Sequence, residues 1–425
     1  MRFVDKVAFI ILFFVLLFIS LNRHSHHPIF NYHSQLFADK AGYHVYFPAY
    51  WYCDMDAKNM PDSIDIKTGQ GFRFEGDKII TKYPIGVAIC QLPFSLIAAV
   101  SDSITGNYKS PGFTESHHLA LNWATALWSV LGLLLVFLTA IRFWKLSYSQ
   151  AYLLVFALLF LSNLLYYTTR DCGMSHAYSF TVFAAINYIV WRFSTTQVMS
   201  NLDVVLLMIF GGLVVALRPL NGVFIVLPLG YVVFSMPSWK SIYFKPKWLM
   251  LLLGLVIAVI PLVLQGLYNQ YAYGKIIADG YVNEGFSNLM NMNIVRLWFA
   301  PHNGVFIYSP ILLFVWLGVI IGSYKNRFVL LFIVYFMIIS LTYAAWWSPE
   351  LGCGFGHRGF TEHLAFFAFP ISTCIKRIPK SKQWISATIM SIVGILLFIA
   401  QYNFDGCWPS ENDWDWELFI RYFKP

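Results

Sequence analysis

The segment Val7-Ala-Phe-Ile-Ile-Leu-Phe-Phe-Val-Leu-Leu-Phe-Ile-Ser-Leu21 is an unbroken apolar run without a charged residue. Arg2 and Lys6 precede it, and Asn22-Arg23-His24 follows it in place of a small-residue cleavage site. We therefore interpret this run as a retained first membrane span, rather than a signal peptide, with its N-terminal end in the cytoplasm.

Further apolar runs follow at 118–141, 150–168, 175–193, 203–217, 221–236, 248–268, 304–323, 328–345, 359–375 and 384–402. Hydrophobic residues make up 58% of the 425 residues and charged residues 12%, against about 45–50% and about 25% in soluble domains. Too few polar side chains exist to cover a water-exposed surface, which excludes an ordinary soluble enzyme and a disordered chain. The sequence predicts an all-α polytopic membrane protein, with about 11 transmembrane helices and a single integral membrane domain over 1–425.

The segment 84–101 is also apolar enough to span, and its placement decides which side every later loop faces. If it lies along the outer face, the short inner loops after it contain Asp203 as their only acid and many basic residues: Arg142, Lys145, Arg192, Lys240, Lys245, Lys247, Lys325, Arg327, Lys376, Arg377, Lys380 and Lys382. The positive-inside rule favours this arrangement. We therefore expect 84–101 to be a juxtamembrane or re-entrant helix. The outer face then carries a large first loop with juxtamembrane helices (22–117), a second loop (269–303) and a C-terminal tail (403–425).

The net charge of +8 fits basic inner loops and attraction to anionic membrane lipids. No basic run is dense enough to predict nucleic-acid binding. The six cysteines form no CxxC pair, so a zinc site of that type is not indicated, and one or two outer disulfides would have a pairing that the sequence does not reveal. The sequence also has no GxxxxGK[ST] nucleotide-binding loop. A reaction at the outer face would therefore use an activated donor already present there.

Candidate site residues gather in the outer segments. Asp39 stands in the first loop, with Tyr43 and Tyr46 after it, and Lys82 precedes Tyr83-Pro84 at the start of the 84–101 segment. An isolated loop carboxylate is often only a helix cap, and a lysine beside an apolar helix is often only an interfacial anchor. Both interpretations stand beside a catalytic one at this point.

Two further features carry arginine near apolar runs. Arg218-Pro219 separates two short runs, where an arginine at membrane depth is costly unless it is paired or functional. The stretch from Trp346 to Gly359 combines several glycines with His357 and Arg358. Backbone amides, a guanidinium and an imidazole together suit an anion such as a lipid phosphate, although a turn in an aromatic belt would have the same composition.

In this order the motifs resemble bacterial membrane glycosyltransferases of the GT-C fold, in the branch related to protein O-mannosyltransferases and the lipid A aminoarabinose transferase. The resemblance covers most of the chain and rests on an ordered set: the Asp39 loop, Lys82-Tyr83-Pro84, Met174-Ser175-His176-Ala177, Arg218-Pro219, Tyr271-Ala272-Tyr273-Gly274 to Gly280-Tyr281, Gly304 to Ser309-Pro310, and Trp347 to Arg358. It implies a GT-C-like fold, a polyprenyl-phosphate sugar as donor, and an acceptor hydroxyl on a glycan, a lipid or a protein.

The resemblance also implies roles for single residues. Asp39 matches the carboxylate that acts as general base, and Lys82 matches a basic residue that contacts the donor phosphate. Further phosphate ligands by position would be Arg218 and Arg358. The residues themselves add His357, beside Arg358, as a phosphate ligand, and the expected substrate pocket includes Tyr43, Tyr46, His176, Tyr281 and Glu350. The sequence departs from the family at Lys40, where many relatives have a second acid, and this weakens a two-carboxylate metal site. Asp54 and Asp56 remain weak metal candidates, and we expect no required cofactor.

The expected location is the bacterial inner membrane, with the site facing the periplasm or exterior and membrane lipids around the protein. Two other functions fit a polytopic protein of this size. A secondary transporter or flippase would have an internal repeat and ionisable residues in mid-membrane, whereas here the charges cluster at the outer ends of spans. A lipid-linked glycan polymerase or ligase would have its large outer loop late in the chain, whereas here the first loop is the large one.

Overall fold

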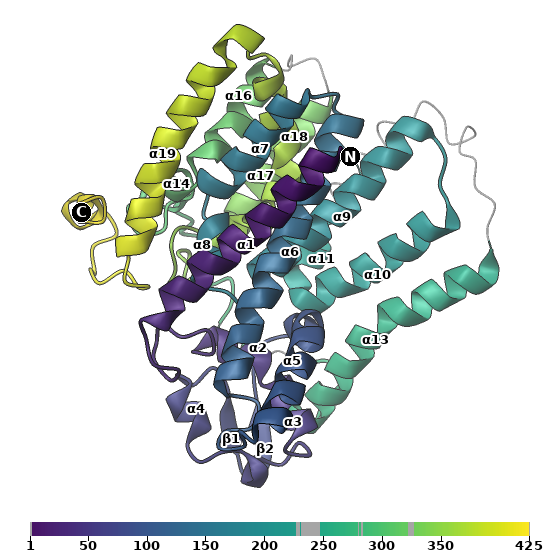
Figure 1. The fold of residues 1–425 in the computed structure, drawn as a ribbon, viewed down its shortest axis with the longest axis vertical. Helices are drawn as coiled ribbons and strands as arrows, with labels where there is room; N and C mark the ends of the chain where they lie inside the picture. The colour runs from purple at the N-terminus through teal and green to yellow at the C-terminus, as the bar shows by residue number, and fades with distance from the viewer. Residues whose placement is uncertain are drawn as a thin grey trace.

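The computed structural model describes residues 2–424 except 227–229, 231–246, 279, 282–283 and 322–326. Most of the described chain is helical, and Figure 1 shows long helices side by side with the irregular first loop at one end of them. The helices of this bundle are α1 (Phe3–Ser25), α6 (Glu115–Arg142), α7 (Tyr148–Phe160), α8 (Leu164–Thr169), α9 (Ser175–Thr196), α10 (Asn201–Leu217), α11 (Pro219–Phe224), α13 (Trp248–Tyr273), α16 (Leu313–Ile321), α17 (Arg327–Ala344), α18 (Leu364–Lys376) and α19 (Gln383–Asn403). The prediction of a mostly helical chain is confirmed.

Five helical stretches in the described chain are long and apolar enough to cross a membrane: α1, α5 (Gly86–Thr105), α6, α13 and Lys380–Asn403, which contains α19. Shorter apolar helices are α7, α10, α18 and Leu330–Ala344 within α17. Several of these helices expose large apolar side chains over much of their length, as expected of surfaces that contact lipid. These helices support a multi-pass membrane protein, whereas the number of about 11 spans stays a prediction. Part of the expected span 221–236 lies outside the described residues.

The first loop folds into small elements at the lower end of Figure 1. They are α2 (Asp39–His44), α3 (Tyr46–Trp51), the 3-10 turn η1 (Ala57–Asn59), α4 (Ile64–Lys67), β1 (Arg73–Glu75) and β2 (Lys78–Ile80). The two strands are antiparallel, with Glu75 opposite Lys78, and Gly76 takes a positive φ of 60° in the tight turn between them. This short hairpin is a departure from the all-α prediction.

Helix α5 packs against α2, α3 and α6, and Figure 1 shows it beside the lower part of α6. Its first residue, Gly86, meets the end of α10: a Cβ there would lie 2.4 Å from backbone atoms of Ala216 and Leu217. The start of α5 is therefore fixed directly beside Arg218. Arg218 itself is extended (φ −155°, ψ 113°), and Pro219 begins α11, so the break expected at Arg218-Pro219 is confirmed.

Two of the expected inner connections, at 142–149 and 376–383, lie together. The Lys376 Nζ donates to the Trp144 carbonyl at 3.0 Å, and the Ser149 hydroxyl donates to Gln383 at 2.9 Å. The N-terminal end reaches the same place, because the Tyr152 hydroxyl donates to Asp5 at 2.7 Å. These contacts agree with the predicted grouping of basic loops at one end. Lys240, Lys245 and Lys325 lie outside the described residues.

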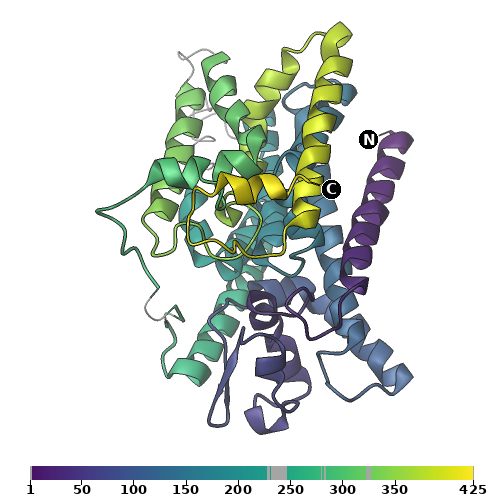
Figure 2. The same cartoon turned by 90° about the vertical axis from the view of Figure 1, so that its left-hand side faces the viewer.

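The expected outer segments meet at the other end. A disulfide joins Cys353, in the loop before α18, to Cys407, in the C-terminal tail. Figure 2 shows this tail, which includes α20 (Trp416–Arg421), crossing in front of the bundle. Disulfides persist in oxidising compartments, whereas the outer location of this end stays a prediction. Two shorter helices, α14 (Ile294–Phe299) and α15 (Val305–Tyr308), and the 3-10 turns η3 (Pro310–Leu312), η4 (Arg358–Phe360) and η5 (Lys380–Lys382) complete the described fold.

The placement of α5 can be tested by accessibility labelling. Asn107 follows α5 and Lys145 follows α6, and both side chains are exposed. In a background without the free cysteines, Asn107→Cys should react with an impermeant maleimide from outside, and Lys145→Cys only after the membrane is opened. Asp62→Cys, exposed in the first loop before α5, serves as the outer reference. Reversed labelling of Asn107→Cys and Lys145→Cys, with Asp62→Cys still reacting from outside, would mean that α5 crosses the membrane.

Candidate functional site

Asp39 is the first residue of α2 and is held by two partners from distant segments. Its Oδ2 accepts a hydrogen bond from the Arg358 Nη1 at 3.0 Å, and its Oδ1 accepts one from the Tyr83 hydroxyl at 2.5 Å. About a third of the Asp39 side chain stays exposed. Burial alone would raise the pKa of this carboxyl, but Arg358, the Tyr83 hydroxyl and Lys82 hold the pKa below its ordinary value. Asp39 is therefore an ionised and reachable carboxylate at neutral pH.

Lys82 lies close to Asp39 on the other side of Tyr83. Its ammonium pairs with Glu284 at 2.5 Å and lies 5.0 Å from the centroid of the Tyr281 ring and 5.6 Å from that of the Tyr83 ring. A cavity of about 340 Å³ separates this group from Asp39, and its lining includes both residues together with the backbone at 69–71 and Gly280. The cavity thus places a carboxylate and a cation around one space that a sugar-sized molecule could enter.

The third cation of the site, Arg218, is paired more deeply. Its Nη1 donates to the Glu362 Oε1 at 2.6 Å, and the His176 Nδ1 lies 2.8 Å from the Glu362 Oε2. Glu362 is fully buried. A buried carboxylate of this kind is stable only with such partners, because an unpaired charge away from water is costly. Glu362 therefore ties the end of α10 to the start of α9.

Aromatic side chains join these three pairs. The Tyr43 and Tyr83 rings lie 4.6 Å apart between centroids, and the Tyr83 and Tyr281 rings 6.5 Å apart. The Tyr43 hydroxyl donates to the Ser175 Oγ at 3.3 Å, next to His176. Tyr43, Tyr281 and Tyr343 all lie close enough to Arg218 to interact electrostatically with its guanidinium group. Of the residues that the sequence nominates, Asp39, Lys82, Arg218, Arg358, Tyr43, Tyr281 and His176 thus belong to one cluster, which we call the Asp39 cluster.

Other nominated residues lie apart from the cavity. Tyr46 packs on Tyr268 and its hydroxyl donates to the Tyr83 carbonyl, so it supports the backbone beside the site. The His357 Nε2 lies 2.8 Å from the Pro349 carbonyl, and burial lowers the pKa of this imidazole to about 3. A neutral, backbone-bonded imidazole holds the loop of Arg358 and adds no positive charge for a phosphate.

Glu350 belongs to a second group of charges, between the loop before α18 and the C-terminal tail. It pairs with Arg296 at 2.8 Å, and Arg296 also pairs with Asp413. Together with the Cys353–Cys407 disulfide, these pairs fix the loop that carries Arg358. Glu350 therefore helps to hold in place the loop that carries Arg358.

The weak metal candidates do not converge. Asp56 caps η1, where its Oδ1 accepts from the Lys58 amide at 2.9 Å, and Asp54 has a positive φ of 49° at an exposed turn. In the ranges that the structure describes, no group of three or more His, Cys, Asp or Glu side chains is arranged to hold a metal ion. The side chains of the Asp39 cluster instead offer cations, which suit an anionic ligand.

Sequence reasoning missed four members of the cluster as site residues: Tyr83, Glu284, Tyr343 and Glu362. Glu362 had a usable signal, since Thr361-Glu362-His363 places an ionisable residue inside the apolar run 359–375, and such residues are rare without a function. Glu284 and Tyr343 had none, because only the folded chain brings them beside Lys82 and Arg218.

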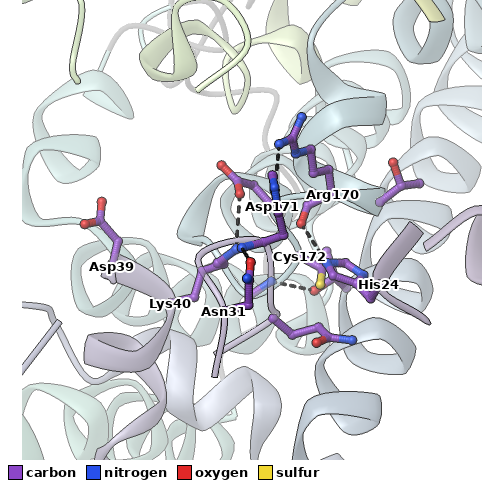
Figure 3. Close-up of polar contacts among 12 residues, drawn as sticks. His24, Asn31, Asp39, Lys40, Arg170, Asp171 and Cys172 are labelled. Atoms are coloured by element: carbon purple, nitrogen blue, oxygen red, sulfur yellow. Dashed lines mark hydrogen bonds and ion pairs between the residues drawn. The ribbon is translucent and has the colours of Figure 1, made fainter. Parts of the chain in front are cut away.

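Figure 3 shows why Lys40 does not extend the cluster. Asp39 and Lys40 point in different directions, and the Lys40 ammonium pairs with Asp171 at 3.2 Å. Adjacent residues at the start of α2 thus lie in two separate environments, and Lys40 makes no contact with the Asp39 carboxylate.

No protein-family profile matches the chain, and no curated protein matches its sequence. Among solved structures, it is similar to the oligosaccharyltransferase of Archaeoglobus fulgidus in the apo form (TM-score 0.48, 14% identity, 99% of this chain and 60% of that chain). It is also similar to archaeal oligosaccharyltransferase AglB from the same organism in complex with an inhibitory peptide and a dolichol-phosphate (TM-score 0.46, 13% identity, the same coverage). The chain spans 60% of the length of these proteins, and its function has to be argued from its own residues.

The buried Glu362 provides a test of how the cluster is held. Glu362→Gln keeps the shape but removes the charge that faces Arg218 and His176, so the free energy of unfolding should fall by about 3–5 kcal/mol. Thermal unfolding in detergent would measure this as a clear drop in midpoint. Asp77→Asn removes one partner of the exposed Lys58–Asp77 pair and should change stability by about 1 kcal/mol or less. Equal effects of the two substitutions would contradict the structural importance of Glu362.

Proposed function

We propose that this chain is a GT-C-type glycosyltransferase that moves a sugar from a polyprenyl-phosphate donor to an acceptor hydroxyl at the outer face of the membrane. One observation carries the proposal: an ionised, reachable Asp39 shares a cavity with Lys82 and contacts Arg358, at the loop end of the apolar helices. A base beside several cations is what this transfer requires. The motif order, with its resemblance to that family, supports the same reaction.

Asp39 is the proposed general base. The acceptor hydroxyl must lose its proton as its oxygen attacks the anomeric carbon, and a carboxylate within hydrogen-bond reach accepts that proton. Asp39 is ionised before the acceptor arrives, because its pKa is held low. The C1–O bond to the donor phosphate breaks as the new C1–O bond forms, so direct attack from the opposite face inverts the anomeric centre.

The leaving group is a lipid phosphate, which needs neutralisation of its charge rather than a proton. Lys82, Arg218 and Arg358 are the proposed phosphate ligands, and guanidinium and ammonium groups are worth more in a water-poor site than in water. In the structure each of them is paired with a carboxylate: Glu284, Glu362 and Asp39, respectively. The donor phosphate would therefore have to compete with at least one of these carboxylates.

Competition at Arg358 has a useful consequence for the base. When the donor phosphate takes up part of the Arg358 hydrogen bonding, Asp39 loses part of the charge that lowers its pKa. A carboxylate with a higher pKa accepts a proton more readily. Binding of the donor would thus strengthen the base at the step that uses it, while the Tyr83 hydroxyl keeps the carboxylate in place.

The proposed setting is a bacterial inner membrane, with about 11 spans, the Asp39 cluster facing the periplasm or exterior, and α5 along that face. The acceptor hydroxyl would belong to a glycan, a lipid or a protein. Mass spectrometry of surface glycans from a deletion strain and its parent would identify the acceptor and the sugar.

Substitution of Asp39 tests the proposed base directly. Asp39→Asn keeps the shape of the side chain, so donor binding should persist while turnover falls by about 10²-fold or more. The assay is release of polyprenyl phosphate by purified protein in the presence of a polyprenyl-phosphate sugar and an acceptor extract. Asp54→Asn, in the same loop but exposed, is the matched control and should stay close to wild type. Near-normal turnover of Asp39→Asn would sink the base assignment.

The pH dependence tests the link between Arg358 and Asp39. The active carboxylate is the ionised form, so activity is present above the pKa of Asp39 and is lost as the pH falls through it. Arg358→Gln removes a cause of the low pKa, and the acidic limb of kcat at saturating donor should move to higher pH.

Lys58→Gln is the control, because Lys58 is exposed and pairs with Asp77 rather than with a residue of the Asp39 cluster, and its acidic limb should match that of wild type. An unmoved limb in Arg358→Gln would show that Asp39 is not the group that titrates.

A further inference from the structure

A second cationic site lies away from the Asp39 cluster, between the outer ends of α1 and α19. It is a cavity of about 270 Å³ whose lining includes Arg23 from the last turn of α1, Arg170 after α8, and Tyr402 from the last turn of α19. Phe18 and Phe398 line the same cavity. Two arginines and an apolar wall therefore share one small space.

Arg170 is the unusual member of this group. It is only 5% exposed, and its Nη1 has no hydrogen-bond partner in the described part of the chain. Its Nη2 lies 3.1 Å from the His33 Nδ1, an imidazole nitrogen rather than a carboxylate. Buried guanidinium groups are normally satisfied by an acid or several carbonyls, because the unmet donor is costly. The unpaired Nη1 of Arg170 thus indicates that an acceptor from outside the described chain binds here.

Arg23 is also without an acidic partner among the described residues. Its Nη1 donates to the Tyr402 carbonyl at 2.8 Å, and its guanidinium lies 4.9 Å from the centroid of the Tyr402 ring. Neither nearby carboxylate forms an ion pair with the two arginines: Asp171 pairs with Lys40, and Asp405 contacts His33 and the Tyr32 hydroxyl. Figure 3 shows the Lys40–Asp171 pair beside Arg170. The cavity therefore presents two guanidinium groups that have no ion-pair partner among the described residues.

The apolar part of the cavity lies deeper along the helices. Phe18 precedes Arg23 by more than one turn of α1, and 69% of its side chain is exposed, as in a helix surface that faces lipid. In a lipid leaflet the headgroup lies at the surface and the acyl chains lie deeper. The cavity has the same order, with its cations at the end of the span and its apolar side chains about one turn deeper. A free inorganic anion would use the arginines but not the apolar wall.

We propose that this cavity binds the phosphate of an anionic phospholipid, with Arg170 and Arg23 on the phosphate and Phe18 and Phe398 against the acyl chains. The site is separate from the donor site, and it stands whether or not Asp39 is a base. A bound headgroup would supply the acceptor that the Arg170 Nη1 lacks and would fasten α1 to α19.

Lipid titrations of the purified, delipidated protein test the proposal. Phosphatidylglycerol should raise the thermal unfolding midpoint and remain bound in native mass spectrometry, whereas zwitterionic phosphatidylcholine should do so much less. Arg170→Gln and Arg23→Gln should each weaken phosphatidylglycerol binding by about tenfold or more, since each loses charge-assisted hydrogen bonds. Arg421→Gln, which changes an exposed arginine in α20, is the matched control and should bind like wild type.

Three outcomes would overturn the proposal. Unchanged phosphatidylglycerol binding in Arg23→Gln would remove the site, and this half-exposed position decides the matter even if Arg170→Gln does not fold. A response to inorganic phosphate as large as that to phosphatidylglycerol would make the cavity a site for a free anion. Equal binding of phosphatidylcholine would leave only a non-selective lipid contact.

Discussion

The ion pair between Asp39 and Arg358 is the contact on which the site depends. It joins the first outer loop to the loop before α18, across 319 positions of sequence. Each charge is only partly exposed, so each needs a partner where water is scarce. The pair therefore fixes α2 against the 3-10 turn η4. The Tyr83 hydroxyl, on the other oxygen of Asp39, fixes the segment before α5 in the same way.

Charge balance explains why these segments can meet at the edge of an apolar bundle. Lys82, Arg218 and Arg358 face Glu284, Glu362 and Asp39, so each cation of the Asp39 cluster has its own carboxylate. A cluster with unpaired cations would repel itself and pull in water. A paired cluster remains compact. On the proposed function, the donor phosphate would have to displace one of the three carboxylates, and contacts with the tyrosine rings would add to its binding.

Much of the fold could be predicted from the sequence, because hydrophobic runs and basic loops are local signals. The break at Arg218-Pro219 and the grouping of basic connections at one end were of this kind. Asp39, Lys82, Arg218 and Arg358 could be nominated from motif order, and the structure brings them together, whereas their chemical roles remain proposals. Glu284 and Tyr343 could not be nominated, because their importance arises only from long-range contacts. The β1–β2 hairpin was missed because three-residue strands carry almost no periodic signal, and the Cys353–Cys407 pairing because spacing does not determine connectivity.

The start of α2 shows how one short segment separates two charged environments. Asp39 and Lys40 are neighbours, yet Asp39 lines the cavity beside Lys82, whereas Lys40 pairs with Asp171 beside Arg170 (Figure 3). Because Lys40 occupies Asp171, that carboxylate is not available to neutralise Arg170. Asp39 in turn keeps its oxygens with Arg358 and Tyr83. Lys40 thus holds Asp171 in an ion pair of its own, apart from both Asp39 and Arg170.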